Sequence, residues 1–390
     1  MSLPVKQIIA DINHICETIG VRPPLSQEEY ETVQFVQERL QGLERVSVSE
    51  QPFYSVGRMA ARLGPSGLIS ALGLLLASNR RRWLRLLGLS LGGIAAWGAN
   101  QIQHGHEAIW ETVMPQRRSH NIVARIAPQK TLRHRVVLVA RLDTDIVRLS
   151  GLPQWRTLFA RPASNLEKLN IWASFIPATL GWSWLRRILA MAAITQSALL
   201  VADEAGPFVP GANANASGVA LLLRLAQELS DHPLHHTEVL IAYTGCDSLG
   251  GRGMAELANE YGHAWRNAKW LVVESVGAGE LCWLTDPAGA TLHRFQPPLA
   301  DRLTRVAATQ PELGVMGRPL AIPDPARPLK SRQLNAVAVM GYARAEAFPA
   351  YWQSANDTVQ HIDSATLEKT WWFLQAVLKH IDRETIPDAK

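Results

Sequence analysis

The sequence predicts a three-layer α/β/α domain, in which helices cover both faces of a mixed, mostly parallel sheet. Short runs rich in Val, Ile and Leu alternate with amphipathic segments along most of the chain, a pattern typical of this fold class. Several of these runs are continuously apolar, as expected for strands that are buried on both faces. The expected strands are residues 46–54, 121–126, 135–140, 237–243, 270–274 and 336–340.

Two helices of this domain are marked by their residue pattern. The helix expected over residues 217–230 follows GANANAS, a run of small residues and residues that cap helices. The last helix carries apolar residues at Leu367, Trp371, Leu374 and Leu378, which is the helical period of 3.6. We therefore expect residues 1–390 to form one domain that contains insertions.

Composition excludes several classes of protein. Hydrophobic residues make up 47% of the 390 residues and charged residues only 19%, which excludes intrinsic disorder. Lys and Arg number 39 against 34 Asp and Glu, an excess too small to predict a nucleic-acid partner. Cys16, Cys246 and Cys282 form no CxxC pair, so neither a disulfide framework nor a Cys-rich zinc site is expected. The first residues lack the pattern of a cleavable secretion signal.

Two inserted hydrophobic helical hairpins are expected at residues 64–101 and 167–203. The first joins two uncharged runs through the basic link NRRRWLR, and the second repeats this pattern around Arg186 and Arg187. Each uncharged run falls short of the roughly 20 apolar residues that cross a membrane. Six of the thirteen tryptophans lie in or beside the hairpins, as is common at membrane interfaces.

These hairpins favour a membrane-associated protein with lipid as a partner, and leave its side and topology open. The alternative is that they are soluble helices packed on each other and on the core, because apolar runs of this length are often buried helices.

Functional groups in open α/β sheets collect at the carboxyl ends of strands. Two strand ends carry acidic segments, RLDTD at residues 141–145 and GCDSLG at 245–250, and a third ends in ESVG at 274–277. The segments PGANANASG at 210–218 and YWQSANDT at 351–358 are expected beside them.

These segments resemble peptidase family M28, the aminopeptidase-type zinc exopeptidases, which include glutaminyl cyclases and the ectodomain of the transferrin receptor. The opening GVRPPLSQEE at residues 20–29 is similar to the family's G-x-R-P-x-G-S-x-E-E. The hydrophobic insertions resemble those of bacterial members. The resemblance implies a zinc-exopeptidase-like fold, a di-zinc site and aminopeptidase chemistry.

The family's catalytic positions are altered in this sequence. The resemblance places the general base at Asp247 and retains the supporting acids Asp143 and Asp357. The former metal-ligand positions are Arg141, Ala214, Ser248, Glu274 and Gln353.

The residue types at these positions do not favour zinc binding. A catalytic zinc needs about three ligands from His, Cys or carboxylate side chains. Arg has no lone pair to give, Ala has no donor atom, and Ser and Gln are weak ligands for zinc. We therefore expect no metal and no other cofactor. Without a metal, the pKa of the attacking water is not lowered, so Asp247 is expected to be inactive as a base.

Three functions follow as hypotheses. The favoured one is a membrane-associated pseudopeptidase that has lost di-zinc catalysis and acts by binding or scaffolding a protein or peptide ligand. The second is an active metallo-aminopeptidase or hydrolase whose reduced or relocated metal site is built from Asp143, Asp247, Glu274 and Asp357. The third is a structural or assembly subunit of a membrane complex. The sequence does not decide whether the chain is an enzyme, but it favours the hypothesis that the chain is not one.

Arg141 is the new cation at this predicted site. Like carboxylates that lie together repel or raise one another's pKa. We expect the Arg141 guanidinium to replace part of the zinc charge by pairing with Glu274 or Asp247. The alternative is that Arg141 points to solvent.

Overall fold

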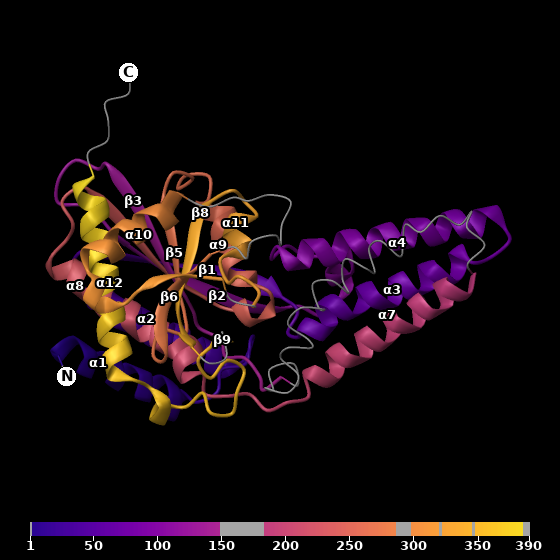
Figure 1. Ribbon diagram of the computed structural model, residues 1–390, viewed down its shortest axis with the longest axis horizontal. Coiled ribbons are helices and arrows are strands. Elements are labelled where there is room, and N and C mark those ends of the chain that lie inside the picture. Colours follow the sequence, from indigo (N-terminus) through magenta and orange to yellow (C-terminus); the bar gives the residue numbers. More distant parts are fainter. Residues whose placement is uncertain (1, 149–182, 286–297, 320–321, 345–347, 385–390) are drawn as a thin grey trace, which may run out of the picture. The chain divides into compact units, whose positions relative to one another are not determined.

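The computed structural model describes residues 2–148, 183–285, 298–319, 322–344 and 348–384. The chain divides into two compact units (Figure 1). The sheet unit comprises Met1–Phe53, Arg118–Asp145 and Phe208–Lys390. The helical unit comprises Tyr54–Arg117 and Ile146–Pro207.

A nine-stranded mixed sheet forms the centre of the sheet unit, in the order β1-β2-β4-β3-β5-β8-β6-β7, with β9 paired to β8. The strands β4, β3, β5 and β8 run parallel, whereas β2 pairs antiparallel with β4 and β6 antiparallel with β8. The predicted fold class, an α/β domain with a mixed sheet, is confirmed. The strands are β1 (Val46–Ser55), β2 (Arg117–Ile126), β3 (His134–Arg141), β4 (Thr237–Thr244), β5 (Lys269–Val273), β6 (Glu280–Leu284), β7 (Met316–Arg318), β8 (Asn335–Ala343) and β9 (Phe348–Pro349).

Helices cover both faces of the sheet (Figure 1). Alternate residues of β3 point to opposite faces, so Val136 and Leu138 join one core cluster and Val137 and Val139 the other. The first cluster is completed by α1 (Leu3–Asn13), α2 (Gln27–Gln41), α8 (Ser217–Asp231), α10 (Pro298–Thr309) and α12 (Ser364–Arg383). The second is completed by α9 (Arg252–Tyr261) and α11 (Arg327–Lys330).

Two of these helices begin at side-chain caps that the sequence supplies. The Ser26 hydroxyl accepts a hydrogen bond from the Glu29 backbone N–H at 3.1 Å, at the start of α2. The Asp363 carboxylate accepts from the Ala365 N–H at 3.0 Å, at the start of α12. The apolar stripe predicted for the last helix is buried, from Leu367 to Ile381.

The helical unit contains α3 (Met59–Ala77), α4 (Arg82–Gln103) and α7 (Ser183–Asp203), with the 3₁₀ turn η2 (Ile109–Val113). α3 packs against both α4 and α7. The helices have 19, 22 and 21 residues, because they continue through the charged and polar residues that flank the uncharged runs. Residues 149–182, which hold most of the first arm of the second predicted hairpin, lie outside the described residues.

Two helices of this unit are long and apolar enough to cross a membrane, Met59–Ala77 and Trp184–Asp203. Length and composition alone are weak support for a membrane span, because the core helices of soluble proteins also meet these criteria.

Small residues form the seams between these helices. A Cβ added at Gly88 of α4 would lie 2.4 Å from the Gly73 carbonyl oxygen of α3. A Cβ at Gly67 of α3 would lie 2.2 Å from the Ser197 hydroxyl oxygen of α7. The helix backbones therefore approach each other closely, as in helix pairs that pack through small residues.

A buried ion pair lies in the same unit. Arg62 of α3 donates to the Glu111 carboxylate at 2.9 Å, and both side chains are almost fully inaccessible to water. Arg62 also donates to the His106 carbonyl at 2.9 Å, and the Trp110 indole N–H donates to the Arg62 carbonyl at 2.8 Å. These bonds satisfy charges that would otherwise be costly to bury, and they join α3 to η2.

Gly88→Ala is expected to lower the free energy of unfolding of the helical unit by about 1–3 kcal/mol, because the new methyl group overlaps the backbone of α3. The matched control is Gly93→Ala on the same helix, where nothing lies within 4 Å of the added Cβ. Alanine favours a helix interior over glycine by about 1 kcal/mol, so the control should be neutral or stabilising. Thermal unfolding of the two variants measures the difference, and equal effects would contradict the close α3–α4 contact.

Candidate functional site

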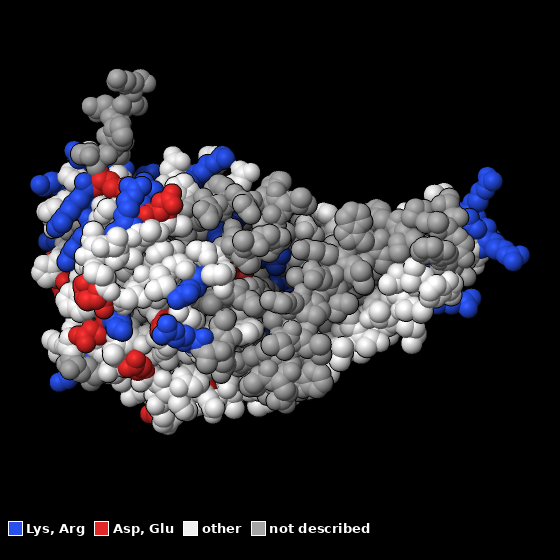
Figure 2. Space-filling model, in the orientation of Figure 1, with Lys and Arg blue, Asp and Glu red and all other residues white. Residues whose placement is uncertain are grey.

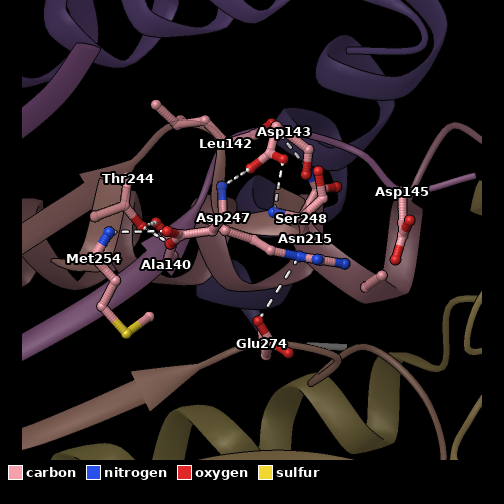
Figure 3. A network of polar contacts seen from close by, with 12 residues as sticks. Ala140, Leu142, Asp143, Asp145, Asn215, Thr244, Asp247, Ser248, Met254 and Glu274 are labelled. Carbon is pink, nitrogen blue, oxygen red and sulfur yellow. Dashed lines mark hydrogen bonds and ion pairs between the residues drawn. The ribbon is translucent and has the colours of Figure 1, made fainter. Parts of the chain in front are cut away.

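The candidate site lies where three parallel strands end. β3, β4 and β5 are neighbours in the sheet, and the last residue of β3, Arg141, is paired with the last residue of β4, Thr244. Asp143, Asp247 and Glu274 follow these strand ends. The structure brings them together, and Figure 3 shows Asp143, Asp247 and Ser248 in one network with Glu274 below them.

Asp143 is a fully buried carboxylate whose two oxygens are both hydrogen-bonded. Oδ1 accepts from the Asp247 backbone N–H at 2.8 Å and Oδ2 from the Ser248 N–H at 2.9 Å. These amides open the short 3₁₀ turn η5 (Asp247–Leu249), so Asp143 fixes the segment that follows β4. Burial raises the pKa of Asp143, while the nearby Arg141 charge opposes that rise.

The carboxylate of Asp247, at the general-base position, also accepts hydrogen bonds from nearby groups of the protein. One oxygen accepts from the Met254 N–H at 2.8 Å, in the first turn of α9, and the other accepts from the Thr244 hydroxyl. Burial, followed by the charge of Asp143, raises the pKa of Asp247 to about 7. One oxygen therefore holds the start of α9 and the other the end of β4, and a water molecule would have to compete with these bonds to use Asp247 as a base.

Arg141 pairs with Glu274. Its Nε lies 3.7 Å from Glu274 Oε2, and the two side chains are 10% and 15% exposed. The predicted pairing is confirmed, and the alternative in which Arg141 points to solvent is wrong. At 3.7 Å this contact is an ion pair and not a hydrogen bond. Burial disfavours the charged guanidinium, yet the carboxylates of Glu274, Asp143 and Asp145 raise the pKa of Arg141 above its ordinary value.

Gln353 contacts an acid that was not among the predicted site residues. Its amide Nε2 donates to Asp145 Oδ2 at 2.8 Å. The Gln353 backbone has a φ of +51°, in the left-handed region that few non-glycine residues adopt. Within the described part of the chain, Gln353 Oε1 is buried without a hydrogen-bond partner. The signal for Asp145 was present in the segment RLDTD, where it alternates with Asp143.

Ala214 and Asp357 meet through backbone groups. The Asp357 carboxylate accepts from the Asn213 N–H at 2.6 Å and the Ala214 N–H at 3.2 Å. These amides belong to the π-helical turn η4 (Ala212–Ala216) that precedes α8. Burial raises the pKa of Asp357 to about 6, against the effect of these two bonds. Asp357 thus caps a helical segment, while Ala214 contributes no side-chain donor.

Two further buried residues support the site and were missed as functional positions, although both lie in the opening motif GVRPPLSQEE. The Arg22 guanidinium donates to the carbonyls of Leu142 at 3.3 Å and Pro210 at 2.6 Å. It also donates to Asn215 Oδ1 at 2.9 Å. The second of these residues is Glu29.

Glu29 binds the turn after β4. Its carboxylate accepts from the backbone N–H groups of Cys246 at 2.8 Å and Leu25 at 2.7 Å, and from the Ser119 hydroxyl at 3.2 Å. Burial, with the charge of Asp143 second, raises the pKa of Glu29 to about 8. Cys246 is buried, and burial raises the pKa of its thiol well above the ordinary value, so this cysteine is not an activated nucleophile.

The residues at this site do not fit the di-zinc centre of the family. Arg141 places a fixed positive charge where a ligand would stand, and the oxygens of Asp143, Asp247 and Asp357 already accept protein hydrogen bonds. In the described ranges, no group of three or more His, Cys, Asp or Glu side chains is placed to hold a metal ion. Glu274 remains as one strong donor, fewer than the about three that a catalytic zinc requires.

The sheet, its covering helices and the position of this site define a zinc-exopeptidase-like fold. Residues 196–378 match the model of peptidase family M28, in agreement with the resemblance that the sequence motifs indicate. No protein of curated function matches the chain by sequence.

Solved structures support the same fold over almost the whole chain. A glutaminyl cyclase from Bacteroides thetaiotaomicron, bound to N-acetylhistamine, is 13% identical with a TM-score of 0.57, and the match covers 98% of each chain. A glutaminyl cyclase from Fimbriiglobus ruber is 14% identical with a TM-score of 0.57, covering 99% of this chain and 97% of that chain. A zinc aminopeptidase from Bacillus subtilis is 14% identical with a TM-score of 0.56, covering 96% and 94%. At these identities the likeness establishes the fold and not the activity.

Arg141→Ala is expected to destabilise the sheet unit by about 3–5 kcal/mol, because it leaves Glu274 charged and buried without its cation. Adding Glu274→Gln to this variant should recover part of the loss, since the uncompensated charge is then removed. Chemical denaturation of the two single variants and the double variant measures the coupling. The control is Arg39→Ala at the ion pair with Asp11, where Arg39 is 48% exposed and the expected loss is below about 1 kcal/mol. Additive effects of Arg141→Ala and Glu274→Gln would contradict the pair.

The stability of the sheet unit is expected to fall with rising pH, in part through Glu29. Because the pKa of Glu29 rises from 4.5 to about 8 on folding, its contribution is fully present below about pH 4.5 and is lost as the pH rises through 8. Glu29→Gln removes this titration, so the free energy of unfolding should depend less steeply on pH between 5 and 8. The change is at most about 1.4 kcal/mol per pH unit. Urea denaturation at several pH values measures it, and parallel curves would contradict the assignment.

Proposed function

We propose that this chain is a membrane-associated protein of the M28 fold that acts by binding a protein or peptide ligand and does not hydrolyse peptides. One observation carries the proposal: the cation at the centre of the strand-end site is the guanidinium of Arg141, paired with Glu274 at 3.7 Å. A guanidinium cannot polarise a bound water as a metal does, because it offers no empty coordination position.

The hydrogen bonds that the remaining acids accept support the same conclusion. Asp143 uses both oxygens to hold backbone N–H groups at the start of η5. Asp247 holds a backbone N–H at the start of α9 with one oxygen and the Thr244 hydroxyl at the end of β4 with the other. Asp357 likewise holds backbone N–H groups of η4. These are structural roles that persist without catalysis, and they explain why a chain that has lost the metal ligands still keeps three of the acids.

An active hydrolase with a reduced metal site remains the second candidate. Such a site would use Asp143, Asp247, Glu274 and Asp357, since carboxylate oxygens also bind hard divalent cations. It would require the cation to displace the Arg141 guanidinium and to share oxygens that already accept protein hydrogen bonds. The cost of that rearrangement makes the binding function the better supported of the two.

Association with a membrane rests on the helical unit. Its helices present large apolar side chains to the outside, among them Leu86 at 66% exposed and Met191 at 63% exposed. Exposed apolar surface of this kind is typical of sites that contact lipid or another protein. A structural subunit of a membrane complex would use the same surface, and stable co-purification with another protein would favour that role.

We expect the purified chain, prepared with zinc in excess, to retain far less than one zinc ion per molecule and to show no aminopeptidase or glutaminyl cyclase activity. Elemental analysis and assays with aminoacyl p-nitroanilides and N-terminal glutamine peptides measure this. One or two tightly bound zinc ions, or turnover abolished by a chelator, would contradict the proposal and support the reduced metal site.

The matched comparison is a variant that carries Arg141→His, Ala214→Asp, Asp247→Glu, Ser248→Glu and Gln353→His. It restores the donor types of the family and is expected to bind zinc. Arg141→His alone should not, because Ala214, Ser248 and Gln353 still lack strong donors.

A further inference from the structure

In the helical unit, small residues are buried between the helices and many large apolar residues are exposed. A soluble helical bundle has the opposite distribution. Among the buried residues described in α3, α4 and α7, Leu74 and Ile102 are the only large apolar ones; most of the others are Gly, Ala or Ser. Many of the large apolar residues face outward instead, while others, such as Leu63, Ile69 and Leu189, are partly buried. Those at least 39% exposed are Leu68, Leu72, Leu75, Trp83, Leu86, Leu87, Ile94, Trp97, Trp184, Ile188, Met191, Ile194, Leu199 and Val201.

In water the opposite arrangement would be more stable, because burying large apolar side chains contributes far more to stability than burying glycine or alanine. In a bilayer the lipid tails are as apolar as leucine, so helices associate through small residues and keep large ones on the outside. Only 39% of the apolar window in α3 and 22% of that in α7 is buried within the protein. This distribution is the reverse of that expected for core helices of a soluble protein.

Charge is distributed unevenly along the same helices. α3 and α7 are antiparallel, since Arg186 NH1 donates to the Ala77 carbonyl at 3.0 Å and the Ser197 hydroxyl donates to the Gly64 carbonyl at 2.9 Å. The C-terminal end of α3 and the N-terminal ends of α4 and α7 therefore form one tip. We call this the arginine tip, which consists of Arg80, Arg81, Arg82, Arg85, Arg186 and Arg187 with Trp83 and Trp184.

The arginine tip has the composition of a membrane interface. Trp83 and Trp184 are 59% and 62% exposed, and Figure 2 shows basic side chains gathered at this end of the helical unit. The sequence has no Asp or Glu from residue 51 to 106 or from 183 to 202, and the acids Asp203 and Glu204 come at the opposite end of α7. Arginine and tryptophan side by side are typical of the headgroup layer, and Lys and Arg gather on the cytoplasmic side of membrane helices.

Helix length agrees with a complete crossing. The 19, 22 and 21 residues of α3, α4 and α7 correspond to about 28–33 Å at 1.5 Å per residue, close to the roughly 30 Å of the hydrocarbon layer. The chain continues into the sheet unit from the ends opposite the arginine tip, before α3 and after α4 and α7.

We propose that the helical unit spans a lipid bilayer with the arginine tip in the anionic headgroup layer of the cytoplasmic leaflet, which places the sheet unit on the opposite side of the membrane. This topology rests on the proposed membrane association and goes beyond it by naming a complete crossing and its direction. The exposed apolar side chains along the helices contact lipid, and the arginine tip contacts anionic headgroups.

Labelling of one introduced cysteine at a time, in a bacterial inner membrane, tests the topology with the full chain. The native Cys16, Cys246 and Cys282 are buried, so they leave a low background for a membrane-impermeant maleimide. Lys130→Cys places an exposed thiol on the sheet unit, and Asn79→Cys places one at the arginine tip. We expect Cys at 130 to react from the outer side of intact inner membranes, and Cys at 79 to react only after the membrane is permeabilised. The protein should stay in the membrane after alkaline carbonate extraction.

Other outcomes separate the two proposals. Reaction at both positions from the same side, or release by carbonate, overturns the crossing while leaving a peripheral association intact. The reverse labelling pattern overturns the direction. Recovery of the whole protein in the soluble fraction overturns the membrane association itself, and leaves the loss of catalysis to be judged by the zinc analysis.

The role of the arginines is tested by the triple variant Arg80→Gln, Arg81→Gln, Arg82→Gln. Removing these charges should produce a mixed orientation, seen as partial reaction of Cys at 79 from the outer side. The control is Arg45→Gln, Arg133→Gln, Arg305→Gln, which removes three exposed arginines from the sheet unit and should leave the orientation unchanged. Identical labelling of both triple variants would overturn the role of the tip.

Discussion

The buried guanidinium of Arg22 holds together the segments from which the strand-end site is built. It donates to backbone carbonyls after α1, after β3 and before α8, and to the side chain of Asn215. The Asn215 amide in turn donates to the Leu142 and Asp143 carbonyls at 2.8 and 2.9 Å. Burial works against the charged form of Arg22 and lowers its pKa, so these bonds are what make a cation tolerable at this depth. The position of Asp143, and through it of Asp247 and Ser248, depends on this arrangement.

A second cation, Arg141, balances the acids at the strand ends. Burial raises the pKa of Asp143, Asp247 and Glu274, which means that their charges are costly in the folded protein. A family member with zinc would meet that cost with the metal. In this chain the protein meets it with a side chain, whose charge is present at every physiological pH and requires no ligand from solution.

The sequence predicted the fold class, six of the strands and the convergence of the strand-end residues, because continuous apolar runs and strand-end acids are local signals. It did not predict β6, β7 and β9, which are short or lie near the edge of the sheet and carry weak patterns. It also missed the partners of Asp247 and Gln353, since hydrogen bonds to Met254 and Asp145 depend on how the loops turn. The reversed packing of the helical unit was hidden for the same reason: composition shows that a helix is apolar, and only the contacts show which residues face outward.

The capping bonds made by Asp143, Asp247 and Asp357 have a consequence for how such chains change over time. An acid that holds the start of a helix is retained by selection for folding, whether or not the protein still catalyses a reaction. A position whose side chain serves only a metal has no such second role, so selection for folding does not retain it. In a lineage that follows this course, the carboxylates of an ancestral active site outlast its histidines, and their presence records the architecture of the domain instead of its chemistry.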